Sequence, residues 1–109
     1  MDLKTFSDEL TSALADTGLF RLVTLETEGP TVPGKASVTS DLFLRFFFNE
    51  ATGTTAFALI ERGNRVWGVD YDNRRGWHRH RKEDPSTHRP IEPMTVGEIV
   101  ARLQTALPR

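Results

Sequence analysis

The fold is decided by residues 36–61, ASVTSDLFLRFFFNEATGTTAFALIE. Alternate residues of a strand point to opposite faces of a sheet, and in residues 36–48 both sets contain apolar side chains. One set is Leu42, Leu44, Phe46 and Phe48, and the other is Phe43, Arg45 and Phe47. We therefore expect a central strand, covered by a helix on one side and partly covered on the other. Residues 49–54 predict a short hairpin loop, and residues 56–61 predict the returning strand.

The flanking segments predict helices at both ends of the chain and further strands. Residues 3–17 repeat apolar side chains at helical spacing, with Asp2 as the N-cap and Gly18 at the end. Thr95 and Glu98 have the spacing of a capping box that opens a second helix. The remaining predicted segments are strands at 20–26 and 65–71, a loop containing Gly29-Pro30 and Pro33-Gly34, a turn at Gly63-Asn64 and an irregular basic loop before the last helix.

This order of elements predicts one α+β domain over residues 1–109. Its expected architecture is a curled four-stranded antiparallel sheet, a meander, with an N-terminal and a C-terminal helix packed on it. The chain has no cysteine, which excludes a disulfide framework, a thiolate zinc site and a cysteine nucleophile. An acidic N-terminal segment without a long apolar run argues against a signal peptide or a membrane span, so we expect a cytoplasmic protein.

The residues able to do chemistry concentrate in one stretch, residues 66–88, VWGVDYDNRRGWHRHRKEDPSTH. It contains all three histidines and both tryptophans of the protein. The surrounding charge is uneven: residues 1–61 hold four Lys and Arg against nine Asp and Glu, whereas residues 62–109 hold ten against six. This asymmetry indicates either a basic face for a polyanion or two halves whose charges pair and cancel.

His78 and His80 are two residues apart, so their rings lie on one side of an extended backbone. With an ordinary pKa of about 6.5, an imidazole accepts or donates a proton near neutral pH. In a metal-free ribonuclease, one ring would take the proton of a ribose 2′-OH and the other would protonate the departing 5′-oxygen. This interpretation requires both rings to face one open groove.

The neighbouring residues fit the same interpretation. Cationic side chains would hold the phosphate and stabilise the charge that develops on its oxygens. Tyr71 and Trp77 would stack on an unpaired base, and Asp70 and Asp72 would form the turn or orient a histidine. The predicted substrate-binding residues are Arg74, Arg75, Trp77, Arg79, Arg81 and Lys82.

Other interpretations of these residues stay open. A His-x-His pair in a basic loop is often a solvated surface feature. With Asp70, Asp72 or His88 the pair would also form a divalent-metal site, but no third ligand stands at a familiar spacing, so no metal or other cofactor is assigned. Trp67 lies in the middle of a predicted strand and is expected in the core. Arg45 is expected to lie along the less buried face of its strand.

Residues 57–93, FALIERGNRVWGVDYDNRRGWHRHRKEDPSTHRPIEP, resemble the TumE-like toxins of bacterial and archaeal toxin–antitoxin pairs. The resemblance rests on a strand that ends in Tyr71-Asp72-Asn73, followed by Gly76 and then by His78-Arg79-His80. The hairpin upstream is also of the family's type. The similarity covers about half of the chain and is weak before residue 36.

The resemblance implies a growth-inhibiting toxin that cleaves RNA and whose gene neighbours an antitoxin gene. It implies His78 and His80 as the acid–base pair in a catalytic set completed by Tyr71 and Asp72, which shape the turn. The expected partners are RNA and the cognate antitoxin, with a homo-oligomer as a further option, and no membrane. An enzyme is favoured over the alternatives, which are a non-catalytic nucleic-acid- or protein-binding module and a metal-dependent nuclease or nucleotidyl-transfer enzyme.

Overall fold

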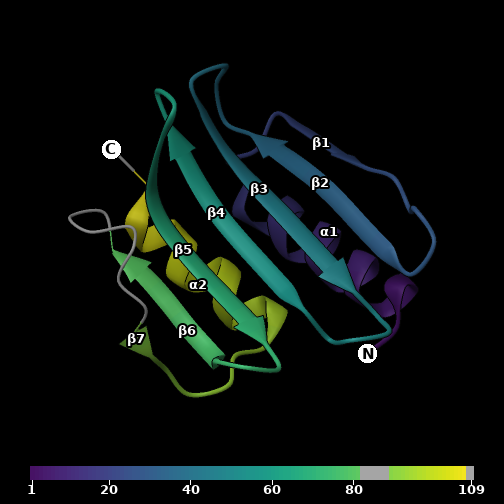
Figure 1. Ribbon diagram of the computed structural model, residues 1–109. Helices are drawn as coiled ribbons and strands as arrows, with labels where there is room; N and C mark the ends of the chain where they lie inside the picture. Colours follow the sequence, from purple (N-terminus) through teal and green to yellow (C-terminus); the bar gives the residue numbers. More distant parts are fainter. Residues whose placement is uncertain (82–88, 108–109) are drawn as a thin grey trace.

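The structure, a computed structural model, describes residues 1–81 and 89–107. These residues form one antiparallel sheet in which every strand pairs with its neighbour in the sequence, together with a helix at each end (Figure 1). The predicted α+β class and the meander are confirmed. The elements are α1 (Leu3–Thr17), β1 (Leu22–Leu25), β2 (Thr31–Ser37), β3 (Leu42–Asn49), β4 (Thr55–Glu61), β5 (Asn64–Asp72), β6 (Gly76–Arg81), β7 (Arg89–Pro90) and α2 (Val96–Ala106).

The prediction of four strands is wrong, because the sheet has seven strands and is not closed. The expected loop around Pro33-Gly34 is β2, which pairs with both β1 and β3. Pro33 and Gly34 favour a turn in isolation, but here they lie opposite Phe47 and Phe46 of β3, so pairing with a long apolar strand outweighs the local preference. The basic segment, expected as an irregular loop, contains β6 and β7.

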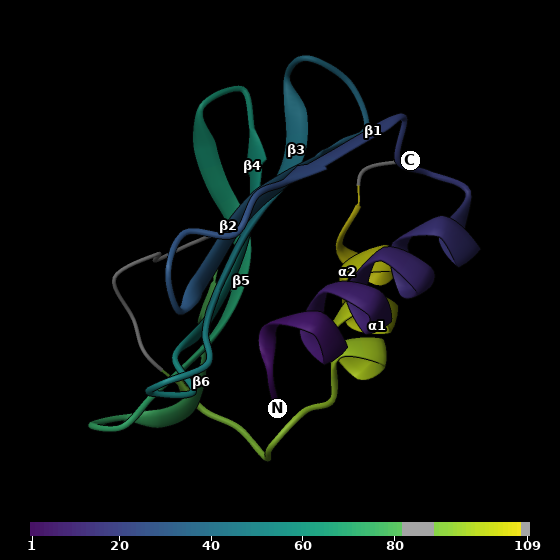
Figure 2. The same cartoon turned by 90° about the vertical axis from the view of Figure 1, so that its right-hand side faces the viewer.

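The two faces of the sheet differ, because both helices lie against one of them (Figure 2). Leu44, Phe46 and Phe48 of β3 are buried on the face that the helices cover. Phe43, Arg45 and Phe47 lie on the other face, as the alternation predicts. We call this second face the helix-free face.

Phe6 of α1 is the centre of the core between the sheet and the helices. Its ring stacks on Phe48, with centroids 4.6 Å apart and planes inclined by 8°. It also lies 6.5 Å from the Phe46 ring and 6.1 Å from the Phe57 ring. Aromatic pairs of this kind contribute about 0.5–1.5 kcal/mol each beyond the burial of their area. The apolar stripe of α2 completes the core with Val96, Ile99, Val100 and Leu103.

Local signals set both ends of α1 and the start of α2 where the sequence predicts them. The Asp2 carboxylate accepts the Thr5 N–H at 2.7 Å, and Gly18 ends α1 with φ 68°. Thr95 and Glu98 form the predicted capping box of α2. Among the described residues, no helix is long and apolar enough to cross a membrane.

Both edge strands of the sheet are short, and a tight turn connects β4 to β5. Four-residue β1 forms one edge and carries the exposed Leu22, whereas two-residue β7 forms the other edge and contains Pro90. The turn between β4 and β5 is Arg62-Gly63, with φ of 50° and 81°. It lies one residue before the predicted Gly63-Asn64, because two successive positive φ angles are what a two-residue hairpin turn needs.

Gly34 lets the Phe46 ring lie against the sheet. A Cβ on Gly34 would overlap that ring and lie 2.7 Å from the Thr24 carbonyl oxygen. We expect Gly34→Ala to lower the free energy of unfolding by about 1–3 kcal/mol, measured by urea denaturation. Gly97→Ala is the control, because Gly97 in α2 has room for a methyl group. It should stabilise the protein by about 0.4–1 kcal/mol. Equal effects of the two substitutions would contradict this role of Gly34.

Candidate functional site

His78 and His80 lie next to each other on β6, and both face the helix-free side of the sheet. In the register of β5 and β6, His78 is opposite Asp70 and His80 is opposite Gly68. Val69 lies between these two positions on β5 and is buried in the core under the helices. The even-numbered residues here therefore point away from the helices, and the predicted orientation of the two histidines on one side is confirmed.

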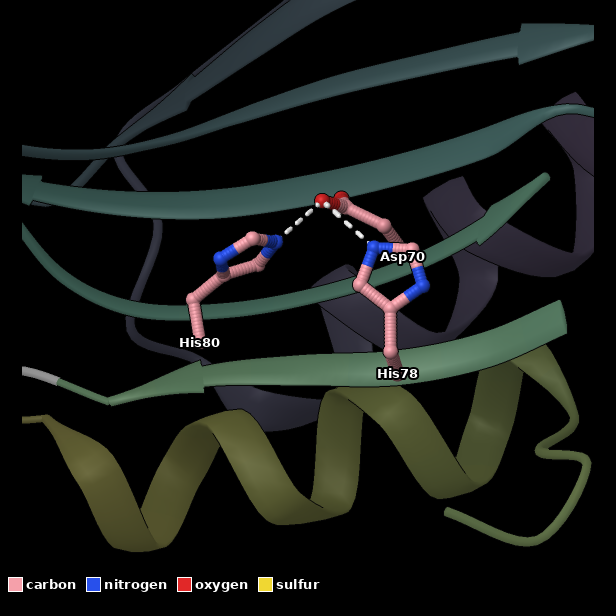
Figure 3. A group of neighbouring side chains, drawn as sticks. All are labelled: Asp70, His78 and His80. Atoms are coloured by element: carbon pink, nitrogen blue, oxygen red, sulfur yellow. Dashed lines mark hydrogen bonds and ion pairs between the residues drawn. The ribbon is translucent and has the colours of Figure 1, made fainter. Parts of the chain in front are cut away.

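The two imidazoles converge on the Asp70 carboxylate (Figure 3). The Nε2 atom of His80 lies 2.8 Å from Asp70 Oδ2, and the Nε2 atom of His78 lies 3.7 Å from the same oxygen. The ring centroids are 5.2 Å apart, with planes inclined by 73°. A carboxylate that contacts both rings fixes their orientation relative to each other.

A guanidinium group contacts the same carboxylate. The Nη2 atom of Arg65 lies 3.2 Å from Asp70 Oδ2. Arg65 reaches this face because the register of β4 and β5 shifts at a β-bulge: Leu59 pairs with Trp67, but Ile60 pairs with Arg65. Without the extra residue, Arg65 would alternate onto the helix side. We call Arg65, Asp70, His78 and His80 the Asp70 cluster.

Gly68 provides the space that the Arg65 side chain occupies. A Cβ built on Gly68 would overlap the Arg65 guanidinium group. Only glycine at this position lets the planar cation lie directly on the sheet beside Asp70. The bulge and the glycine therefore act together, because the bulge sets the direction of the side chain and the glycine lets it lie flat.

The Asp70 cluster is well shielded from solvent. His78 is 2% exposed, His80 is 7% exposed and the Asp70 side chain is 19% exposed. The expectation of two rings in an open groove is therefore wrong for this structure, although the rings do share one face. Asp70 Oδ1 and Arg65 Nε are buried, and neither atom forms a hydrogen bond with the part of the chain that the structure describes. A buried polar atom without a partner costs about 1–3 kcal/mol, so this arrangement is poorly explained by stability alone.

The hydrogen bonds assign one proton position in each ring. The Nδ1 atom of His78 lies 3.0 Å from the Gly76 carbonyl oxygen, and a carbonyl only accepts, so Nδ1 carries a proton. The Nε2 atom of His78 then faces Asp70. A carboxylate oxygen accepts, so the Nε2 atom of His80 donates to Asp70 Oδ2. The cluster thus contains an aspartate–histidine pair and a second imidazole beside it.

Three other predicted site residues lie on the opposite face of the sheet. Tyr71 and Trp77 pair across β5 and β6 on the helix side, with ring centroids 5.3 Å apart. They line a pocket of about 340 Å³ between the sheet and the helices. Arg79 faces a second pocket on that side together with Trp67, which packs against the core as predicted. The structure does not bring these residues together with the histidine pair.

The remaining predicted residues lie at the turn or at the end of β6. Asp72 Oδ1 accepts the N–H groups of Arg74 and Arg75 at 2.9 and 2.8 Å, so Asp72 shapes the turn as expected. The side chains of Arg74 and Arg75 are exposed there. Arg81 is the last residue of β6 and lies opposite Trp67 in the register. Lys82 and His88 lie outside the described residues.

The sequence does not single out Arg65, and it indicates Asp70 as a residue that forms the turn, orients a histidine or binds a metal ion. A signal for Asp70 was present: a hairpin in which Asp72 and Gly76 flank the turn places Asp70 directly opposite His78. No pattern in the sequence indicates the bulge that turns Arg65 toward them.

The turn between β5 and β6 gives a prediction about pH. Hydrogen bonds from the Arg75 and Arg74 N–H groups lower the pKa of the Asp72 carboxyl below its usual 3.8. Asp72 therefore stabilises the fold above pH 3.8, and this contribution is lost as the pH falls through the lower, folded pKa. Between about pH 5 and about pH 2.5, the free energy of unfolding should fall more in the wild type than in Asp72→Asn, whose neutral amide oxygen still accepts both bonds.

Asp72→Ala is the control for this measurement. It removes the acceptor as well as the charge, so it should destabilise the protein at both pH values. Parallel pH profiles of the wild type and Asp72→Asn would contradict the assigned role of the carboxylate.

The Asp70 cluster thus offers two imidazoles, a carboxylate that orients them and a fixed guanidinium cation. Such a set is able to move protons, to bind an anion near Arg65 or to coordinate a cation through its nitrogen and oxygen atoms. The chemistry of these four residues is the basis for a functional assignment. Comparison of the chain with models of protein families, with curated proteins and with solved structures finds no match.

Proposed function

We propose that this protein is the toxin of a toxin–antitoxin pair and that it cleaves RNA without a metal, with His78 and His80 as the acid–base pair. The observation that carries the proposal is the convergence of both imidazoles on one carboxylate, with ring centroids 5.2 Å apart. The resemblance of residues 57–93 to TumE-like toxins supports the biological role. Residues 78 and 80 are the histidines of the motif that carries this resemblance.

In the proposed reaction the 2′-oxygen of a ribose attacks the adjacent phosphorus, and the bond from phosphorus to the 5′-oxygen breaks. His80 takes the 2′-OH proton, while Asp70 contacts its Nε2 atom and stabilises the resulting imidazolium. His78 enters the reaction as the imidazolium and gives one of its two N–H protons to the departing 5′-oxygen, so that it leaves the step as the neutral ring. Arg65 stabilises negative charge that develops on the phosphate. Because both rings are nearly buried, RNA binding must expose them to the substrate.

Conservative substitutions test this mechanism best, because alanine would leave a cavity at a buried ring. His78→Gln and His80→Gln should each lower the rate of RNA cleavage in EDTA by about 10²–10⁴-fold. The rate is measured on a labelled RNA by gel electrophoresis. Circular dichroism and the midpoint of thermal unfolding establish that each variant is folded.

A cell-growth assay provides the matched test of the biological role. Expression of the wild type should stop growth, and co-expression of the neighbouring gene should restore it. His78→Gln should be harmless, whereas Arg102→Ala, which changes an exposed arginine of α2, should remain toxic. Cleavage that persists in both histidine variants would refute the mechanism.

A divalent-metal site is a second candidate, favoured by one observation. One ligand atom each from Asp70, His78 and His80 lies within 4.8 Å of the others. Two imidazoles and a carboxylate are a common ligand set for transition metals. Arg65 opposes this use of the site, because its guanidinium cation already contacts the carboxylate oxygen that a metal ion would take.

Metal titration separates the two candidates. If the site is an acid–base pair, cleavage should be unchanged by EDTA, and calorimetry should detect no tight binding of Zn²⁺ or Mn²⁺ that depends on His80. If it is a metal site, chelation should abolish activity, and Arg65→Ala should raise metal affinity by removing the competing cation. Metal-dependent activity that is lost in His80→Gln would overturn the metal-free mechanism.

A further inference from the structure

Two cations lie directly opposite each other on the helix-free face, away from the Asp70 cluster. Lys35 of β2 pairs with Arg45 of β3 in the register, and both side chains are exposed. Like charges at directly opposite positions of neighbouring strands are destabilising. A bound anion between them would remove this repulsion.

Neither cation is neutralised by a side chain among the described residues. The ion pairs of the described residues involve neither Lys35 nor Arg45. Their described contact is instead with one aromatic ring: Lys35 Nζ lies 4.1 Å and the Arg45 guanidinium carbon 5.9 Å from the centroid of Phe43. The ring holds the two charges near each other but leaves the positive charge uncompensated.

A row of small residues connects this pair to the Asp70 cluster. Following the register across the sheet, Arg45 pairs with Ala58, Ala58 with Gly68, and Gly68 with His80. The row from Lys35 to His80 covers four inter-strand spacings, about 19 Å. Because Ala58 and Gly68 have little or no side chain, the backbone of an extended ligand is able to lie close to the sheet along this row. The Arg65 guanidinium group lies on the sheet at Gly68, so a third cation stands beside the same row.

The charge on this face is distributed unevenly along the row. Among the described strand residues that point to the helix-free face, the carboxylates are Asp70 and Asp72, both on β5. Among these strand residues, those of β2 and β3 therefore carry positive charge alone. Phe47 lies in the adjacent row, which runs through Ala56 to Asp70, and its ring is half-buried. A partly exposed aromatic ring beside cations is a suitable surface for an unpaired base.

We infer that Lys35 and Arg45 bind the phosphodiester backbone of single-stranded RNA, which crosses the helix-free face toward the Asp70 cluster. This inference rests on the proposed function, because it assigns a substrate-binding path to the same reaction. It differs from the predicted path, whose residues Trp77 and Arg79 lie on the helix side of the sheet. A single strand fits better than a duplex, because its bases are free to stack on Phe47.

Binding of a non-cleavable probe tests the inference independently of catalysis. The probe is a short fluorescent single-stranded oligonucleotide with 2′-O-methyl riboses, which lack the attacking hydroxyl group, and affinity is measured by fluorescence anisotropy. Lys35→Ala/Arg45→Ala should weaken binding at least tenfold. In this double variant, the logarithm of the binding constant should fall less steeply with the logarithm of the salt concentration. The slope should be smaller by about 1.4, which corresponds to two phosphate contacts on a single strand. Arg45→Lys should retain most of the affinity, and Arg102→Ala on α2 should bind like the wild type.

The outcomes separate this inference from the proposed function. Unchanged affinity and salt slope in the double variant, or no binding by the wild type, would overturn the inference even if His78 and His80 are needed for cleavage. Loss of binding in the double variant, without cleavage of unmodified RNA by the wild type, would support the binding path and overturn the nuclease. Equal displacement of the probe by polyglutamate of the same charge would overturn RNA as the occupant.

Discussion

The strict alternation of side chains across the sheet is the constraint on which the rest of the structure depends. Burial of Phe46 and Phe48 against Phe6 fixes which face of β3 lies under the helices. Each later strand pairs with its predecessor, so this choice passes through β4 and β5 to β6. A slip of one residue would exchange every side chain between the two faces. The position of the histidine pair is therefore determined by packing of aromatic rings several strands away.

The Asp70 cluster interrupts this regular pattern in a way that costs stability. The bulge before Trp67 turns Arg65 away from the helix side. Because Gly68 has no side chain, the Arg65 guanidinium group lies flat on the sheet. A carboxylate oxygen and a guanidinium nitrogen are then buried without a hydrogen bond to any described residue. Residues held at such a cost commonly serve a chemical purpose, which is the physical reason for placing the proposed reaction there.

Much of the scaffold was predictable from local patterns, whereas the site was predictable only in part. The caps at Asp2 and Thr95 and the alternation of β3 are properties of short segments, and the sequence alone indicates them. β2 was missed because the turn preference of Pro33-Gly34 is overcome by pairing with β3, which is a tertiary effect. The shared side of His78 and His80 follows from extended backbone. The same alternation places Tyr71 and Trp77 on the other face, which follows only when residues 76–81 are a strand and not the predicted loop.

The two edge strands of the sheet, β1 and β7, differ in how much backbone they offer for pairing with a further strand. At β7, a strand of two residues includes Pro90, which has no amide hydrogen to offer, so another chain finds little to pair with there. At β1, four residues present a longer run of backbone beside Leu22, an apolar side chain that is 61% exposed. The described backbone therefore offers more positions for pairing at the β1 edge than at the β7 edge. β1 lies five strands from β6 in the sheet, so a strand added beside β1 would leave the Asp70 cluster uncovered.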